Sequence, residues 1–140
     1  MTRYLAGLVT GFALLVATLA TTPALADVTG LETVPSANGL YRVTIRPEQS
    51  PAGVGPIHAW IANVTDADGK PVEGADIAID GGMPGHGHGL PTAPAMTDVL
   101  APGEYRIDGV KFSMTGAWEL RLAIEAPAGA DTAVFSFTVD

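Results

Sequence analysis

The sequence has no cysteine among its 140 residues. This absence excludes a disulfide framework, thiolate zinc sites, a blue-copper thiolate, a cysteine nucleophile and a lipid-modified cysteine anchor. A soft metal ion bound to this protein must therefore take its sulfur from methionine. Thioether sulfur favours Cu(I), and imidazole binds copper in either oxidation state.

Basic residues are also scarce, with 7 Lys and Arg against 15 Asp and Glu and a net charge of −8. Nucleic-acid binding depends on clustered Lys and Arg that displace counterions from phosphates. The charge balance therefore argues against a nucleic-acid partner. An acidic surface favours solubility and a mild attraction of cations.

Helical periodicity is missing beyond residue 26, whereas short alternating segments rich in β-formers recur between Gly, Pro and Asp turns. These segments predict strands at residues 40–45, 57–64, 75–80, 96–100, 105–108, 110–114, 118–124 and 132–139. Their number and spacing predict an all-β fold, an immunoglobulin-like antiparallel β-sandwich of about seven strands. We expect residues 27–140 to form this single domain.

The first 26 residues have the pattern of a secretory signal peptide. Arg3 provides a basic start, residues 5–20 are almost wholly apolar, and Ala24-Leu25-Ala26 is an A-x-A cleavage site before Asp27. Residues 1–26 are therefore predicted to be removed, which would place the protein in the periplasm. The alternative is an uncleaved membrane anchor, since about 20 apolar residues can span a bilayer.

Two of the three histidines lie in a Gly- and Pro-rich segment at residues 80–89. His86 and His88 are separated by one glycine, and Met83 precedes them. In an extended segment the two imidazoles project the same way, because side-chain direction repeats every two residues. Two imidazoles and a thioether suit copper. The alternative is a flexible loop with no metal.

The third histidine is predicted to join the same end of the sandwich. An Asp-Gly turn between residues 57–64 and 75–80 predicts an antiparallel hairpin. This hairpin would place His58 opposite Asp80 or Gly81, where the histidine-rich segment begins. His58 is then a further candidate ligand, or alternatively a structural histidine at the edge of the core.

Two further methionines are candidates for the sulfur ligand. Met114 follows Phe112 at a spacing of two and lies at the end of a predicted strand, so it is either a ligand or core filler. Met96 follows the histidine-rich segment and is the weaker candidate.

An enzyme is not expected. Cupin dioxygenases and copper/zinc superoxide dismutase also use a His-x-His pair, but both need further histidines, and none follows His88. The serines at 36, 50, 113 and 136 lie in no nucleophile-elbow pattern.

Several motifs together resemble the FixH/YtkA-like family, over residues 57–139. They are His58-x-Trp60, Asp68-Gly69-Lys70-Pro71-Val72-x-Gly74-Ala75, Met83-Pro84-x-His86-x-His88-Gly89-Leu90-Pro91-Thr92, Gly103-x-Tyr105 and Gly109-Val110-x-Phe112-x-Met114-x-Gly116-x-Trp118-Glu119-Leu120. The combination of MPxHxHG with FxMxGxWEL is the more specific part. The DGKPVxGA segment is common in bacterial β-sandwiches.

The resemblance implies an exported or membrane-anchored β-sandwich associated with copper handling and with assembly of haem–copper oxidases. Carried over by position, it implies that Met83, His86, His88 and Met114 hold copper, with His58 as an addition. FixH itself keeps a membrane anchor, whereas the hydrophobic segment of this chain is predicted to be removed.

Together these observations predict a periplasmic copper carrier or chaperone. It would hold Cu(I), or alternatively Cu(II), in a partly exposed His/Met site, and would pass it to a copper-accepting exported or membrane protein. The alternative is an exported β-sandwich that binds another protein and no metal. A metal site would show proton-linked binding, since imidazole must be neutral to ligate.

Overall fold

The computed structural model describes residues 27–140, so the predicted signal peptide lies outside the described residues. The elements are β1 (Val28–Thr29), β2 (Val34–Pro35), β3 (Tyr41–Pro47), β4 (Ile57–Asp66), β5 (Asp76–Met83), the 3₁₀ turn η1 (Pro84–His86), β6 (His88–Gly89), β7 (Ala95–Ala101), β8 (Glu104–Lys111), β9 (Gly116–Ala126) and β10 (Gly129–Val139). Within residues 27–140, no helix is long and apolar enough to cross a membrane.

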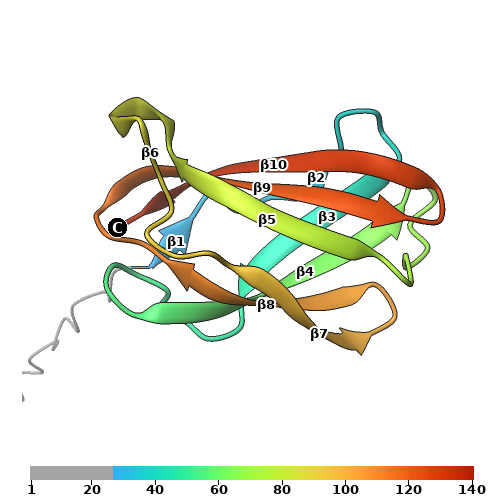
Figure 1. The fold of residues 1–140 in the computed structure, drawn as a ribbon, viewed down its shortest axis with the longest axis horizontal. Coiled ribbons are helices and arrows are strands. Elements are labelled where there is room, and N and C mark those ends of the chain that lie inside the picture. Colours follow the sequence, from blue (N-terminus) through green and yellow to red (C-terminus); the bar gives the residue numbers. More distant parts are fainter. Residues whose placement is uncertain (1–26) are drawn as a thin grey trace, which may run out of the picture.

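The strands form one antiparallel sheet in the order β1-β10-β9-β5-β7-β8-β4-β3-β2, with β6 added to β5. This sheet curls so that β9 and β10 pack against β3, β4 and β8 (Figure 1). Seven of the described strands have seven residues or more, and β1, β2 and β6 have two. The predicted all-β sandwich is confirmed.

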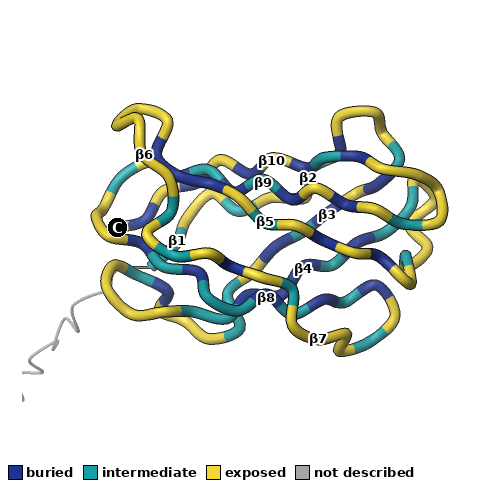
Figure 2. Tube along the Cα trace, viewed as in Figure 1, coloured by how far each residue is buried: buried dark blue, intermediate teal, exposed yellow. Residues whose placement is uncertain are grey.

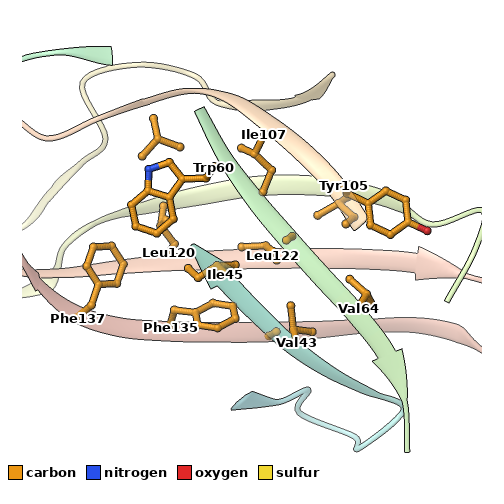
Figure 3. Packing of buried hydrophobic residues seen from close by; sticks show 14 of the residues in the cluster. Val43, Ile45, Trp60, Val64, Tyr105, Ile107, Leu120, Leu122, Phe135 and Phe137 are labelled. Carbon is orange, nitrogen blue, oxygen red and sulfur yellow. The ribbon is translucent and has the colours of Figure 1, made fainter. Parts of the chain in front are cut away.

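The core lies between the two layers, because each long strand buries alternate residues. Buried and more exposed positions alternate along β9 and β10, as the colours in Figure 2 show. Figure 3 shows Leu120, Leu122 and Phe135 facing Trp60 and other side chains of the opposite layer. One strand, β8, replaces the two predicted at 105–108 and 110–114, because Gly109, with φ 92°, lies within it.

The predicted hairpin between residues 57–64 and 75–80 is wrong. The turn itself forms, with the Asp66 carboxylate accepting hydrogen bonds from two backbone N–H groups. However, β4 pairs with β3 and β8, whereas β5 pairs with β9. After the turn the chain makes a single bridge, Thr65 to Pro71, and then crosses to the other layer. The Val72 N–H still donates to the Val64 carbonyl, but the Val64 N–H donates to the Gly103 carbonyl instead of the returning chain. Since β3 and β8 occupy both edges of β4, no edge is left for β5 and the pairing ends there.

A buried carboxylate, Asp131, holds the segment before β3. It accepts hydrogen bonds from the Ser36 hydroxyl (2.6 Å) and from the backbone N–H groups of Asn38, Leu40 and Thr132. Burial alone would raise the pKa of Asp131, but these hydrogen bonds prevail and lower it from 3.8 to about 2. Asp131 is therefore an ionised structural anchor at the end of the sandwich away from residues 80–89.

Candidate metal centre

The histidine-rich segment forms a compact projecting loop at the end of β5 (Figure 1, upper left). We call residues 82–89 the His loop. Its tip is the 3₁₀ turn η1, closed by Gly87 in the left-handed conformation with φ 69°. The chain then returns as β6, which pairs with the end of β5. The tip is exposed (Figure 2).

Gly82 allows the two strands of the His loop to approach each other. A Cβ atom at Gly82 would lie 2.3 Å from the carbonyl oxygen of His88 and 2.7 Å from the Cα of Gly89. Any other residue would therefore push β6 away from β5. The glycine next to it, Gly81, faces the neighbouring strand equally closely, since a Cβ there would lie 2.3 Å from the carbonyl oxygen of Glu119.

Met83 and His88 are directly opposite each other in the β5–β6 pair. Opposite residues of an antiparallel pair project to the same face, with Cβ atoms about 4.5–5.5 Å apart. Met83 faces the core and is 1% exposed, whereas His88 is exposed. On the other side of β5, Gly82 pairs with Glu119, so the next step of the register places Met83 opposite Trp118.

His88 lies over this buried methionine. Its ring centroid is 5.8 Å from that of Trp118, with the planes at 71°. Its Nδ1 lies 3.0 Å from the Gly89 carbonyl oxygen, which can only accept, so Nδ1 carries the hydrogen. The lone pair for a metal is then on Nε2. A backbone carbonyl that orients the other ring nitrogen is the usual second partner of a metal-binding histidine.

His86 is close enough to His88 for both rings to bind one ion. Their centroids are 6.0 Å apart. An ion about 2.0 Å from a ring nitrogen lies about 3.2 Å from that ring's centroid, so two rings on one ion have centroids within about 6.4 Å. His86 also lines a groove of about 520 Å³ on the outer face of β9 and β10. It is therefore accessible from outside.

Met114 lies beside the same cluster, in the loop between β8 and β9. Its carbonyl oxygen accepts a hydrogen bond of 3.0 Å from Nε1 of Trp118, and the residue is 39% exposed. Two residues further on, a Cβ at Gly116 would lie 3.0 Å from the Met83 methyl carbon. The two predicted sulfur ligands thus lie at one end of the sandwich, Met83 at the end of β5 and Met114 in the loop before β9.

His58 is at this end of the sandwich but in different surroundings. It lies opposite Val110 of β8, and its Nε2 donates a 2.9 Å hydrogen bond to the Gly53 carbonyl oxygen. Its ring stacks on Phe112, with centroids 6.3 Å apart. Among residues 27–140, the aromatic pairs join His58 to His88 only through Phe112 and Trp118.

The structure therefore brings Met83, His86 and His88 together, with the Met114 backbone bonded to the adjoining Trp118, and it sets His58 apart with two aromatic rings between. Met96 is half-buried on β7 opposite Ile107, where it packs against the core. From the sequence, Trp60 or Trp118 could shield an ion at this end of the sandwich, but both were expected to be core residues; the structure places Trp118, and not Trp60, beside His88. The signal was present in the two-residue spacing of Gly116 and Trp118, which puts both on the inner face of β9.

The donor set fits a soft ion. Within the described part of the chain, no group of three or more His, Asp or Glu side chains could hold a metal ion. The candidate donors at the His loop other than imidazole are the methionine sulfurs, a type of donor that favours Cu(I). Asp80 and Arg121 line a pocket at the His loop together with Met83 and His88. Arg121 pairs with Glu119 and, at 2.8 Å, with Asp80, and its hydrogen bond lowers the pKa of Asp80.

The fold and this cluster define a small β-sandwich protein with a loop of histidine and methionine at one end. The chain belongs to the YtkA-like family, whose family model matches residues 36–123 and so includes every candidate ligand named above. Among solved structures, the ZirS C-terminal domain is similar, with a TM-score of 0.41 and 12% sequence identity, over 96% of this chain and 86% of that chain. No curated protein matches the chain.

Proposed function

We propose that the protein binds Cu(I) at the His loop through Met83, His88, His86 and Met114, and that it serves as a periplasmic copper carrier without catalytic activity. The observation that carries the proposal is the opposition of Met83 and His88 across the β5–β6 pair. It supports binding because a soft sulfur and an imidazole then project from the same face of one strand pair.

The uneven exposure of the proposed ligands supports transfer rather than permanent storage. Met83 is buried, whereas His86 and His88 are exposed and Met114 is 39% exposed. A partner can replace the exposed ligands one at a time while Met83 still holds the ion. The glycines at 85, 87 and 89 let the imidazoles move without disturbing the core, since a Cβ at any of these positions would meet no atom closer than 3.5 Å.

The proposed ligand set leaves out His58. Its Nε2 is bonded to the Gly53 carbonyl, and Phe112 and Trp118 stand between it and His88. We propose that His58 is structural and that it holds the loop at residues 50–56 against β4.

A copper titration tests the proposal directly. The purified protein would be titrated anaerobically with Cu(I) against a chromophoric Cu(I) chelator, and separately with Cu(II) and Zn(II). We expect one equivalent of Cu(I) to bind more tightly than Zn(II), and we expect His86→Ala/His88→Ala and Met114→Leu to weaken Cu(I) binding. Met96→Leu is the matched control, because Met96 lies on β7 away from the His loop. Equal affinity in all variants would refute the site.

The second candidate is a protein-binding domain with no metal. It is favoured by exposed apolar side chains at the same end, where Val54 is 38% and Ile57 is 64% exposed. This candidate predicts that neither Cu(I) nor Zn(II) binds, and that the histidine variants behave like wild type in the titration.

We further propose that the copper passes to a membrane or exported acceptor involved in haem–copper oxidase assembly. In cells lacking the protein, oxidase activity should fall when copper is scarce and recover when copper is added. The Met114→Leu chain should restore less activity than the Met96→Leu chain. Unchanged oxidase activity at low copper would refute the role in oxidase assembly, and would not bear on whether the protein binds copper.

A further inference from the structure

Trp118 contacts or adjoins three of the four proposed ligands. Its ring lies 5.8 Å from that of His88, and its Nε1–H donates to the carbonyl oxygen of Met114. Its neighbour on the inner face of β9 is Gly116, where a Cβ would meet the Met83 methyl group at 3.0 Å. A residue that only filled the core would not need to link separate parts of the proposed site.

The position of Met83 determines on which side of His88 an ion would sit. Met83 lies between β6 and β9, opposite His88 on one side and, by register, opposite Trp118 on the other. An ion shared by Met83 and His88 is therefore on the Trp118 side of the imidazole. It would lie about 3.2 Å from the centroid of His88. Because the two ring centroids are only 5.8 Å apart, the indole comes within the range of about 6 Å over which aromatic rings attract cations.

We infer that Trp118 is part of the copper site, an inference that rests on the proposed function. Its indole forms an aromatic wall against the bound Cu(I) and excludes water from that side. Through the Nε1–H bond it also positions Met114. Copper binding at the His loop is thereby coupled to the position of the loop between β8 and β9. A wall without nitrogen or oxygen donors favours Cu(I) over Zn(II), which binds imidazole, thiolate and carboxylate ligands.

Trp60 is an internal control in the same molecule. It is as deeply buried as Trp118, at 1% exposure, and lies against Phe112 and Phe137 rather than a proposed ligand. Its Nε1 has no hydrogen-bond partner in the described chain, unlike that of Trp118. The two indole groups should therefore respond differently to copper.

The experiment is an anaerobic Cu(I) titration of the ¹⁵N-labelled protein, observed through the two indole N–H signals in NMR. Cu(I) is diamagnetic, so signals shift without being broadened by unpaired electrons. The Trp60→Phe variant identifies which signal belongs to Trp118. We expect the Trp118 signal to shift until one equivalent is bound and the Trp60 signal to remain nearly fixed.

Affinity gives an independent readout. Trp118→Leu, which removes the aromatic ring, should weaken Cu(I) binding about 3- to 30-fold, the range of one cation–π contact, and should leave the weaker Zn(II) binding unchanged. Binding of Cu(I) with no shift of the Trp118 signal, or equal Cu(I) affinity in Trp118→Leu and wild type, would overturn the inference and leave the proposed function standing. Failure of the wild-type protein to bind Cu(I) would overturn both.

Discussion

Met83 and His88 face each other across the β5–β6 pair, one buried and one exposed. Within this one residue pair, Met83 belongs to the core of the sandwich and His88 to its surface. Met83 is held by the packing of the whole domain, whereas His88 lies between two glycines on a short strand. In the proposed copper site, Met83 is therefore the fixed ligand and His88 the exposed one.

Replacement of Met83 should separate packing from metal binding. Leucine has nearly the same volume, so Met83→Leu should change the free energy of unfolding by less than about 1.5 kcal/mol. It removes the sulfur, so Cu(I) affinity should fall at least tenfold. Denaturant unfolding and chelator competition measure the two effects, with Met96→Leu as control. Unchanged Cu(I) affinity would show that Met83 is only a core residue.

The His loop should depend on a glycine at position 82. Gly82→Ala puts a Cβ 2.3 Å from the His88 carbonyl oxygen, so β6 must move away from β5. We expect the ring contact between His88 and Trp118 to be lost and Cu(I) binding to weaken. Gly85→Ala is the control, since nothing lies within 4 Å of a Cβ there and its φ is not positive. NMR contacts between the two rings provide the measurement, and equal behaviour of the variants would contradict it.

Removal of the His58 imidazole should leave copper binding intact. In His58→Gln the side-chain amide can still donate to the Gly53 carbonyl, which keeps the neighbouring loop in place. We expect Cu(I) affinity within twofold of wild type, measured by the same chelator competition. A tenfold loss would mean that His58 moves toward the His loop when copper binds.

Asp131 should make stability depend on pH in the acidic range. Its pKa is lowered from 3.8 to about 2 in the folded state, so between these values the unfolded chain binds more protons. Its contribution is therefore complete well above pH 3.8 and is lost as pH falls toward 2. Asp131→Asn should destabilise the protein at pH 7 and flatten this dependence. Urea unfolding from pH 6 to pH 2 tests it, and parallel curves for both proteins would contradict it.

Tyr105 should hold the crossing between β4 and β5. Its hydroxyl donates to the Val72 carbonyl at 2.6 Å and accepts from the Ala75 N–H at 3.1 Å. Tyr105→Phe leaves both groups without this partner and should cost about 1–3 kcal/mol. Hydrogen exchange of the Ala75 amide should accelerate. Tyr41→Phe, which loses only a bond to the Gly129 carbonyl, should leave that amide protected. Equal protection in both variants would refute the role of Tyr105.

Much of the fold could be predicted from local patterns. The alternation in β9 and β10 identified both strands and their buried faces, because side-chain direction in a strand repeats every two residues. The partner of each strand was harder to predict. The Asp-Gly turn after β4 was recognised, yet β5 pairs with β9, because β3 and β8 occupy both edges of β4 and Tyr105 stabilises the crossing. The register of His58 was wrong for the same reason.

The sequence by itself determined which side chains the candidate site offers: two histidines around one glycine and methionines nearby, with no cysteine, so that a soft metal could take sulfur only from methionine. Only the tertiary structure decided which of these residues meet. It placed Met83 under His88, brought Trp118 against both, and put Phe112 between Trp118 and His58. The chemical properties of each side chain can be read from the sequence. Contacts between strands depend on the pairing register, which is selected by packing of the whole core.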